Sequence, residues 1–163
     1  MDVRMGLARL VRSFSRFRRL QPLVGRAQAA VVRRSGGRIR RSRLLAAGQP
    51  VMVLTTMGRR SGATRRTMVA YLRHGDGYAS CALNLGSDHD PAWALNLKAH
   101  PTALLQVNGE DVKVRAREAM GEEADELWSA FIKRVPATGR SRQLANRHVP
   151  MFVFEPIGGQ RAS

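Results

Sequence analysis

Two short runs of strand-forming residues joined by Asn108-Gly109 constrain the fold of this chain more than any other feature. TALLQV precedes the pair and EDVKVRARE follows it. Asn-Gly is favoured in the type I′ turn, whose twist matches that of two antiparallel strands. Residues 102–118 are therefore predicted to form a β-hairpin, which commits the chain to an antiparallel sheet.

Further runs extend this sheet at residues 51–57, 65–73, 78–83 and 148–156. A helix is predicted after Asp90, which has the side chain of a good N-cap and precedes Pro91 at the first helical position. A second helix is predicted over 121–135, whose acidic start and basic end suit the helix dipole. This mainly β content with helices, an α+β fold, favours a small barrel with the helices packed outside.

The charge of the chain divides it into parts that need separate explanations. The sequence holds 28 Lys and Arg against 12 Asp and Glu. Residues 1–43 contain 13 of the arginines and a single acid, Asp2, for a local charge of +12, so the other 120 residues carry only +4. We therefore predict a basic arm over 1–43, a globular domain over 44–157 and a flexible tail over 158–163.

An apolar stripe runs through the basic arm at helical spacing. It consists of Val3, Leu7, Leu10, Val11, Phe14 and Phe17. Such a basic amphipathic helix can pack on its own barrel, lie on an anionic membrane surface or bind nucleic-acid phosphates. Nucleic acid is the least favoured partner, because no recognition motif is present and exposed aromatics do not alternate with the basic residues.

The sequence predicts a cytoplasmic protein. Polar residues such as Gln21 and Arg26 interrupt the stretch that could serve as the apolar part of a secretory signal. The single cysteine, Cys81, forms no internal disulfide and fits a reducing compartment. No run of about 18 apolar residues is present. If the arm binds lipid, the protein is expected at the inner face of the plasma membrane.

The side chains that usually carry catalysis form no recognisable set. Metal-ligand spacing is missing among the histidines, His74, His89, His100 and His148, so no metal site is predicted. Cys81 is interpreted as an inert core residue. A solvated helix N-terminus explains the acidic cluster Glu122, Glu123, Asp125 and Glu126. Since nucleophile elbows and Gly-rich phosphate loops are also missing, any enzymatic chemistry is expected to come from a bound cofactor.

The segment TTMGRRSGATRR, residues 55–66, carries the most specific signal. It follows a predicted strand, and Gly58 and Gly62 allow the backbone to approach a ligand closely. Guanidinium groups and hydroxyls flank the turn, on Arg59, Arg60, Ser61, Thr64, Arg65, Arg66 and Thr67. Such groups beside free backbone N–H groups suit a phosphate or a carboxylate. We predict an anion site here, the alternative being a solvated hairpin tip.

Several segments of the chain together resemble one known family. They are LTTMGRRSGATRR (54–66), the strand from Tyr71 to Asp76, NLGSDHDPAWALNLKAHP (84–101) and RHVPMFVFEP (147–156). The similarity is to the deazaflavin-dependent nitroreductases, also described as F420-dependent quinone reductases. It implies a split β-barrel of the flavin-binding kind. It also implies coenzyme F420, a 5-deazaflavin with a phosphodiester and an oligoglutamate tail.

The resemblance further implies roles for individual residues. The phosphate and carboxylates of F420 would be held by Arg59, Arg60, Ser61, Arg65 and Arg66. The edge of the deazaflavin ring would meet the backbone of Leu83 and Asn84. The cofactor cleft would be lined by Pro91, Ala92, Trp93 and Asn96. No protein nucleophile is needed, and Tyr71 is a candidate proton donor.

The activity that the resemblance implies is hydride transfer from reduced F420 to a lipophilic acceptor of quinone or nitro type. The basic arm is similar to that of membrane-associated members, and split barrels of this kind commonly form homodimers. Residues 135–150 lack the tyrosines that shape the acceptor pocket in many members. Two alternatives therefore stay open, a non-catalytic barrel that binds a fatty acid or another hydrophobic ligand, and an FMN-dependent reductase.

Overall fold

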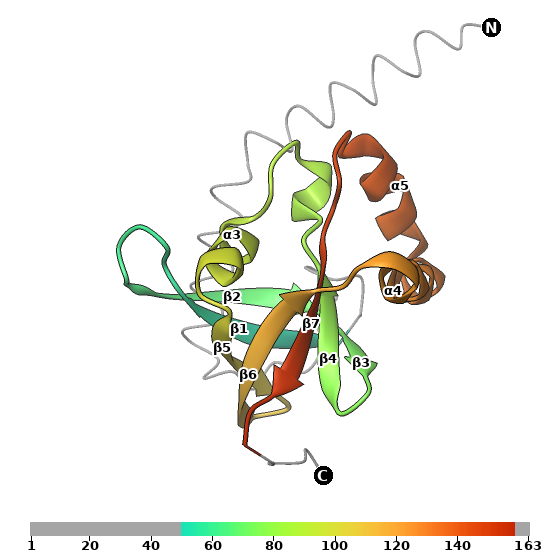
Figure 1. Cartoon of the computed structure of the whole chain (residues 1–163). Helices are drawn as coiled ribbons and strands as arrows, with labels where there is room; N and C mark the ends of the chain where they lie inside the picture. The colour runs from blue at the N-terminus through green and yellow to red at the C-terminus, as the bar shows by residue number, and fades with distance from the viewer. Residues whose placement is uncertain (1–49, 159–163) are drawn as a thin grey trace, which may run out of the picture.

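The computed structural model describes residues 50–158, so the arm predicted over 1–43 lies outside the described residues. Within this range seven strands form one sheet in the order β2-β1-β5-β6-β7-β4-β3 (Figure 1). The strands are β1 (Val51–Met57), β2 (Thr64–Ala70), β3 (Leu72–His74), β4 (Gly77–Cys81), β5 (Thr102–Val107), β6 (Glu110–Glu118) and β7 (Met151–Pro156). The helices are the short 3₁₀ helix η1 (Asn84–Gly86) and the α-helices α3 (Ala92–Ala99), α4 (Gly121–Arg134) and α5 (Pro136–Leu144).

The predicted hairpin is confirmed as β5–β6. Its strands pair antiparallel from Thr102↔Arg115 to Val107↔Glu110. Asn108 and Gly109 have φ angles of +55° and +96°, the left-handed conformation that a type I′ turn needs at both central positions. Along β6 buried and exposed residues alternate, so one face of the hairpin is committed to the interior.

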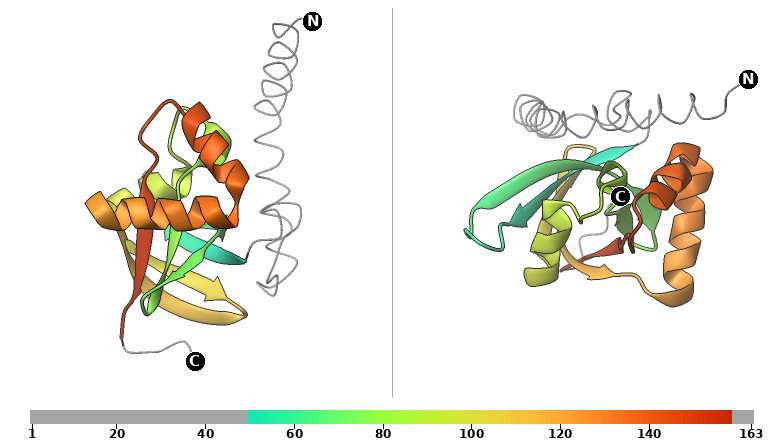
Figure 2. Two further views of the ribbon diagram at one scale, coloured as in Figure 1. Left: turned by 90° about the vertical axis from the view of Figure 1, so that its right-hand side faces the viewer. Right: turned by 90° about the horizontal axis from the view of Figure 1, so that it is seen from above.

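The sheet curls around a core, and β7 is buried on both of its faces. Phe152 and Phe154 belong to the core inside the curl, with residues of β1, β4, β5 and β6. Met151 and Val153 belong to a second core with Trp128 of α4. The figures show α4 and α5 on the side of the sheet away from α3 (Figures 1 and 2). A strand covered on both faces explains the uninterrupted apolar run MFVF.

The strand predicted over 65–73 needs correction. The run 65–73 is not a single strand, because the chain changes partner at Tyr71: β2 pairs with β1, whereas β3 pairs with β4. The Tyr71 N–H donates to the carbonyl of Pro50 at this break.

Helix α5 was not predicted. Its sequence is polar and has no long apolar stripe, and Pro136 at its start is the only helix signal.

Asp90 is not the N-cap of α3, contrary to the prediction. Pro91 occupies that position, and no side chain caps the helix. The Asp90 carboxylate is bound elsewhere, by Arg147 at 2.6 Å and by Lys98 at 3.0 Å. Two cations therefore take the oxygens that would otherwise accept backbone N–H groups of the first turn.

The inert interpretation of Cys81 is confirmed, while that of the acidic cluster fails at Glu123. Burial raises the pKa of the Cys81 thiol to about 12, which keeps it protonated. The Glu123 carboxylate accepts two hydrogen bonds from Arg117, at 2.6 and 2.8 Å, and lies 3.0 Å from His74 Nε2. These contacts join α4 to β6 and β3. Over residues 50–158, no helix has both the length and the apolar character to cross a membrane.

The Glu123 contacts predict a specific loss of stability in acid. Hydrogen bonds from Arg117 lower the pKa of Glu123 from 4.5 to about 2, so the folded state resists its protonation. The stabilisation is present above pH 4.5 and is lost as the pH falls towards 2. Glu123→Gln should remove this pH dependence and cost about 1 kcal/mol at neutral pH, since the pair is partly exposed.

Urea unfolding at stepped pH measures this effect, with the exposed neighbour Glu122→Gln as the matched control. The control should keep the acid sensitivity of the wild type. Identical pH dependence in Glu123→Gln and the wild type would contradict the role assigned to this carboxylate.

Candidate functional site

The turn between β1 and β2 is built to hold its backbone tightly while leaving its arginines outside. Gly58 N–H donates to the carbonyl of Ala63 at 2.9 Å, and Gly62 N–H donates to the carbonyl of Gly58 at 2.8 Å. Gly62 has φ = +66°, which residues with a side chain rarely adopt. A Cβ at Gly58 would lie 3.0 Å from the Ala63 oxygen, which is tighter than most Cβ contacts, so this close approach also favours glycine.

A cleft of about 580 Å³ opens between this turn, α3 and the segment that follows β4. Figure 1 shows the turn projecting beyond the sheet beside α3. Its lining residues are Thr56, Gly58, Arg59, Arg60, Ser61, Arg65, Arg66, Thr67, Asn84, His89, Pro91, Ala92, Trp93 and Asn96. The structure therefore brings together every residue that the sequence analysis places at a cofactor except Leu83.

The cleft is strongly basic. The side chains of Arg59, Arg60, Arg65 and Arg66 are exposed, and the lining contains no Asp or Glu. Over residues 50–158, no ion pair joins any of these four guanidinium groups to a carboxylate. A guanidinium that no carboxylate neutralises can make charge-assisted, bidentate hydrogen bonds to an anion. This arrangement is suited to a ligand with several negative charges.

Asn96 fixes the turn to α3. Its amide is 4 % exposed and bonds on both sides, since Nδ2 donates to Thr56 Oγ1 at 3.1 Å and Oδ1 accepts from the Arg59 N–H at 3.1 Å. These bonds join β1, the turn and the helix at one point. Asn96 is thus more than the lining residue that the resemblance implies, because its amide also holds the backbone of Arg59, the first of the four arginines.

The segment from β4 to α3 forms the other wall of the cleft. Asn84 has φ = +49°, and its Nδ2 donates to the His89 carbonyl at 3.1 Å. Trp93 is nearly buried and packs edge-to-face on Phe152, with ring centroids 5.4 Å apart. Leu83 lies outside the lining, and its carbonyl accepts from the Gly86 N–H. Pro91, Ala92 and Trp93 thus give this wall an apolar and aromatic surface, in contrast to the arginines of the β1–β2 turn.

Two lining residues were not predicted. Thr56 could have been found from the alternation of β1, because it follows the inward residues Met52 and Leu54 at even spacing. His89 gives no such signal, since it lies in an irregular loop and only its nearness to Pro91 points to the cleft.

The tyrosine predicted as a proton donor is in the core. Tyr71 is 8 % exposed and packs edge-to-face on Tyr78, with centroids 5.3 Å apart. Burial raises the pKa of Tyr71, and the residue does not line the cleft. Tyr78 is the only other tyrosine of the chain, and it does not line the cleft either. Within residues 50–158 no three His, Cys, Asp or Glu side chains gather as a metal site would require.

Comparison with known proteins identifies the family. The profile of the family described as F420H(2)-dependent quinone reductase matches residues 24–156. The chain belongs to this family. An F420H(2)-dependent quinone reductase of Mycobacterium tuberculosis (strain H37Rv) is 30 % identical over 105 residues, which cover 63 % of this chain and 69 % of that protein.

Solved structures agree with this assignment. An F420-H2 dependent reductase, FDR-A, superposes with a TM-score of 0.60 at 29 % identity and covers 65 % of this chain and 94 % of its own. A structure described as a domain-swapped dimer gives the same TM-score and identity over 80 % of that chain. A heme binding protein from Mycobacterium smegmatis shares the fold, with a TM-score of 0.53 at 20 % identity over 70 % of this chain and 49 % of its own. These likenesses confirm the predicted split β-barrel.

Membership of the family makes the chain an F420H2-dependent oxidoreductase with coenzyme F420 as its cofactor. The basic rim of the cleft and its apolar wall around Trp93 fit a flat ring that carries a polyanionic tail. The placement of this tail on the β1–β2 turn stays a prediction.

Asn96→Ala should loosen this site and destabilise the fold. The change leaves the Thr56 hydroxyl and the Arg59 N–H without partners, at an expected cost of about 1–3 kcal/mol in the free energy of unfolding. Chemical denaturation measures the loss. Thr56→Val is the matched variant, because it removes only one end of the network while keeping the shape of the side chain. If the free energy of unfolding of Asn96→Ala lies within about 0.5 kcal/mol of the wild-type value, the amide does not hold the turn.

Proposed function

We propose that this chain binds reduced F420 in the cleft beside α3 and passes a hydride to a lipophilic acceptor of quinone type. The observation that carries the proposal is the basic, acid-free rim beside the apolar wall formed by Pro91, Ala92 and Trp93. Reduced deazaflavin supplies two electrons as a hydride when it is bound. The task left to the protein is to hold ring and acceptor in register and to exclude water.

The arginines of the β1–β2 turn are proposed to bind the tail. Arg59, Arg60, Arg65 and Arg66, with the Ser61 hydroxyl, present donors for the phosphate and the carboxylates. The ring is proposed to lie against Pro91, Ala92 and Trp93, with Asn84 at its edge. The placement of Leu83 outside the lining favours Asn84 over Leu83 for the ring-edge contact.

His89 is proposed to supply the proton that the reduced acceptor takes up with the hydride. Among the lining residues, His89 alone carries an imidazole, a side chain that serves as a general acid or base in catalysis. His89 Nδ1 lies 3.2 Å from both Asn84 Nδ2 and the carbonyl of Asp90. This role takes the place of the one predicted for Tyr71, which the structure buries in the core.

Cofactor binding is expected to quench Trp93 fluorescence saturably when F420 is added. The chain has two tryptophans, and Trp128 lies in α4 beneath the Arg142 guanidinium, outside the cleft. Trp128→Phe should therefore keep the quenching, whereas Trp93→Phe should abolish it. FMN, which lacks the oligoglutamate tail, should bind more weakly. Absence of saturable binding at micromolar F420 would remove the proposed function.

Replacing Arg60 and Arg65 together by Gln should weaken F420 binding by at least tenfold and flatten its salt dependence. Each lost guanidinium removes a screened attraction to the tail, so less affinity remains for salt to suppress. Arg115→Gln is the matched control, since Arg115 is exposed on β6 and does not line the cleft. Titration at low and high salt separates the variants, and an unchanged salt slope in the double variant would contradict the tail site.

The arm over 1–43 is proposed to attach the protein to anionic membranes, where a lipophilic quinone dissolves. Reduced F420 should then be oxidised faster with menaquinone in vesicles containing anionic lipid than in zwitterionic vesicles. Phe14→Ser with Phe17→Ser should remove this difference while leaving turnover of a water-soluble quinone intact. Equal rates on both vesicle types would contradict membrane attachment.

His89→Gln should lower turnover of both acceptors at saturating F420, because the proposed proton donor is lost. Unchanged turnover at saturating F420 would contradict this role.

A further inference from the structure

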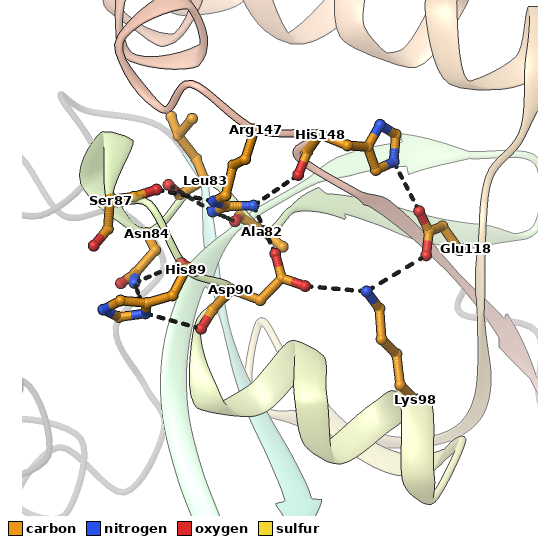
Figure 3. Close-up of polar contacts among 10 residues, drawn as sticks. All are labelled: Ala82, Leu83, Asn84, Ser87, His89, Asp90, Lys98, Glu118, Arg147 and His148. Atoms are coloured by element: carbon orange, nitrogen blue, oxygen red, sulfur yellow. Dashed lines mark hydrogen bonds and ion pairs between the residues drawn. The ribbon is translucent and has the colours of Figure 1, made fainter.

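The Arg147 guanidinium lies behind the cleft wall and uses all of its donors. Nε donates to the Ser87 carbonyl at 2.9 Å, and Nη2 donates to the carbonyls of Ala82 at 2.9 Å and Leu83 at 3.4 Å. Nη1 donates to the His148 carbonyl at 2.9 Å and to Asp90 Oδ1 at 2.6 Å (Figure 3). An arginine has five N–H donors, and these five contacts account for them.

These contacts tie down the segment that forms one wall of the cleft. Ala82 and Leu83 follow β4, Ser87 follows η1, and Asp90 precedes α3. Between Asn84 and Asp90, the backbone bonds that the structure describes are those of η1 alone, such as the Ser87 N–H to the Asn84 carbonyl at 3.1 Å. The Ala82 N–H donates to the Pro150 carbonyl at 2.9 Å, and beyond Ala82 it is Arg147 that bonds Leu83, Ser87 and Asp90 to the chain just before β7.

Charge balance extends the attachment to α3. Asp90 accepts from Arg147 with Oδ1 and from Lys98 with Oδ2. One carboxylate therefore joins Arg147, which precedes β7, to Lys98 in α3. The Arg147 and Asp90 side chains are only 13 % and 15 % exposed, so water screens their attraction less than that of surface pairs. Lys98 also approaches Glu118, which pairs with His148 (Figure 3).

We infer that Arg147 is a positioning residue, which holds residues 82–90 in the shape that the F420 cleft requires. The inference rests on the proposed function. Arg147 does not line the cleft, and its donors are engaged, so it has none left for an anion. Its effect on the cofactor must pass through Asn84, His89 and Pro91, whose segment it anchors. It thus differs in kind from the arginines of the β1–β2 turn.

Arg147→Gln and Arg147→Lys test this role. Gln should lower F420 affinity at least tenfold, measured by fluorescence at a temperature well below each variant's unfolding transition. Lys keeps the charge beside Asp90 but offers three donors without the planar fork, so it should recover part of the lost affinity. Arg142→Gln is the matched control from the same part of the chain, because Arg142 stacks on Trp128 outside the cleft, and it should bind F420 within twofold of the wild type.

The salt dependence of F420 affinity separates positioning from direct contact. Arg147→Gln should keep the steep salt dependence of the wild type, because the tail-binding arginines are unchanged, whereas Arg60→Gln should flatten it. Wild-type affinity in folded Arg147→Gln, or a flattened slope, would overturn the inference.

If the Gln variant does not fold, Arg147→Lys and Asp90→Asn carry the same test. Asp90→Asn should weaken F420 binding at an unchanged salt slope, and wild-type affinity in both variants would overturn the inference. Failure of the wild type itself to bind F420 would remove the proposed function instead, so the two failures are distinguishable.

Discussion

Repulsion among like charges is the constraint on which the site depends. Four guanidinium groups lie within one turn and its flanks, and no carboxylate among the lining residues offsets them. Such a turn must be held by interactions that leave the charges free. The neutral amide of Asn96 does this, because it hydrogen-bonds the Arg59 N–H and the Thr56 hydroxyl and not the guanidinium groups. The cleft therefore keeps its positive field for a ligand, while buried neutral bonds supply the rigidity.

The opposite wall of the cleft, residues 82–90, is held by a charged side chain instead of a neutral one. Residues 82–90 leave β4 and reach α3 with little regular structure, so several carbonyls need donors. One partly buried guanidinium, that of Arg147, is paired with Asp90 and donates to several of them. Charge thus stabilises the structure behind one wall and is left exposed to the cleft on the other. Asp90 offsets the charge of Arg147, and Glu118 lies 3.9 Å from Lys98.

The fold was largely predictable because its strongest signals are local. Each can be recognised within a few consecutive residues: the Asn108-Gly109 turn, the apolar run of β7, and the acidic start and basic end of α4. The errors fell where a distant partner decides the outcome. The break at Tyr71 follows from a change of neighbouring strand, and the Asp90 carboxylate is drawn from the helix by Arg147, 57 residues away.

The candidate site divides in the same way between local and distant causes. The arginines of the turn could be identified from their spacing, and the resemblance to a family supplied the residues of the aromatic wall. Arg147 and the bonding role of Asn96 could not be identified, because a buried hydrogen bond between segments leaves no periodic pattern in a sequence. His89 was missed because an irregular loop has no preferred face.

The order of strands gives this enzyme room to change its chemistry. The connection from β4 to β5 passes over two intervening strands, β7 and β6, and on the way it supplies the aromatic wall of the cleft. Its length and sequence can vary without altering any register within the sheet. Because Asn96 lies in the same connection and bonds the backbone of Arg59, a change there reaches both sides of the cleft while the pairing of the strands stays intact.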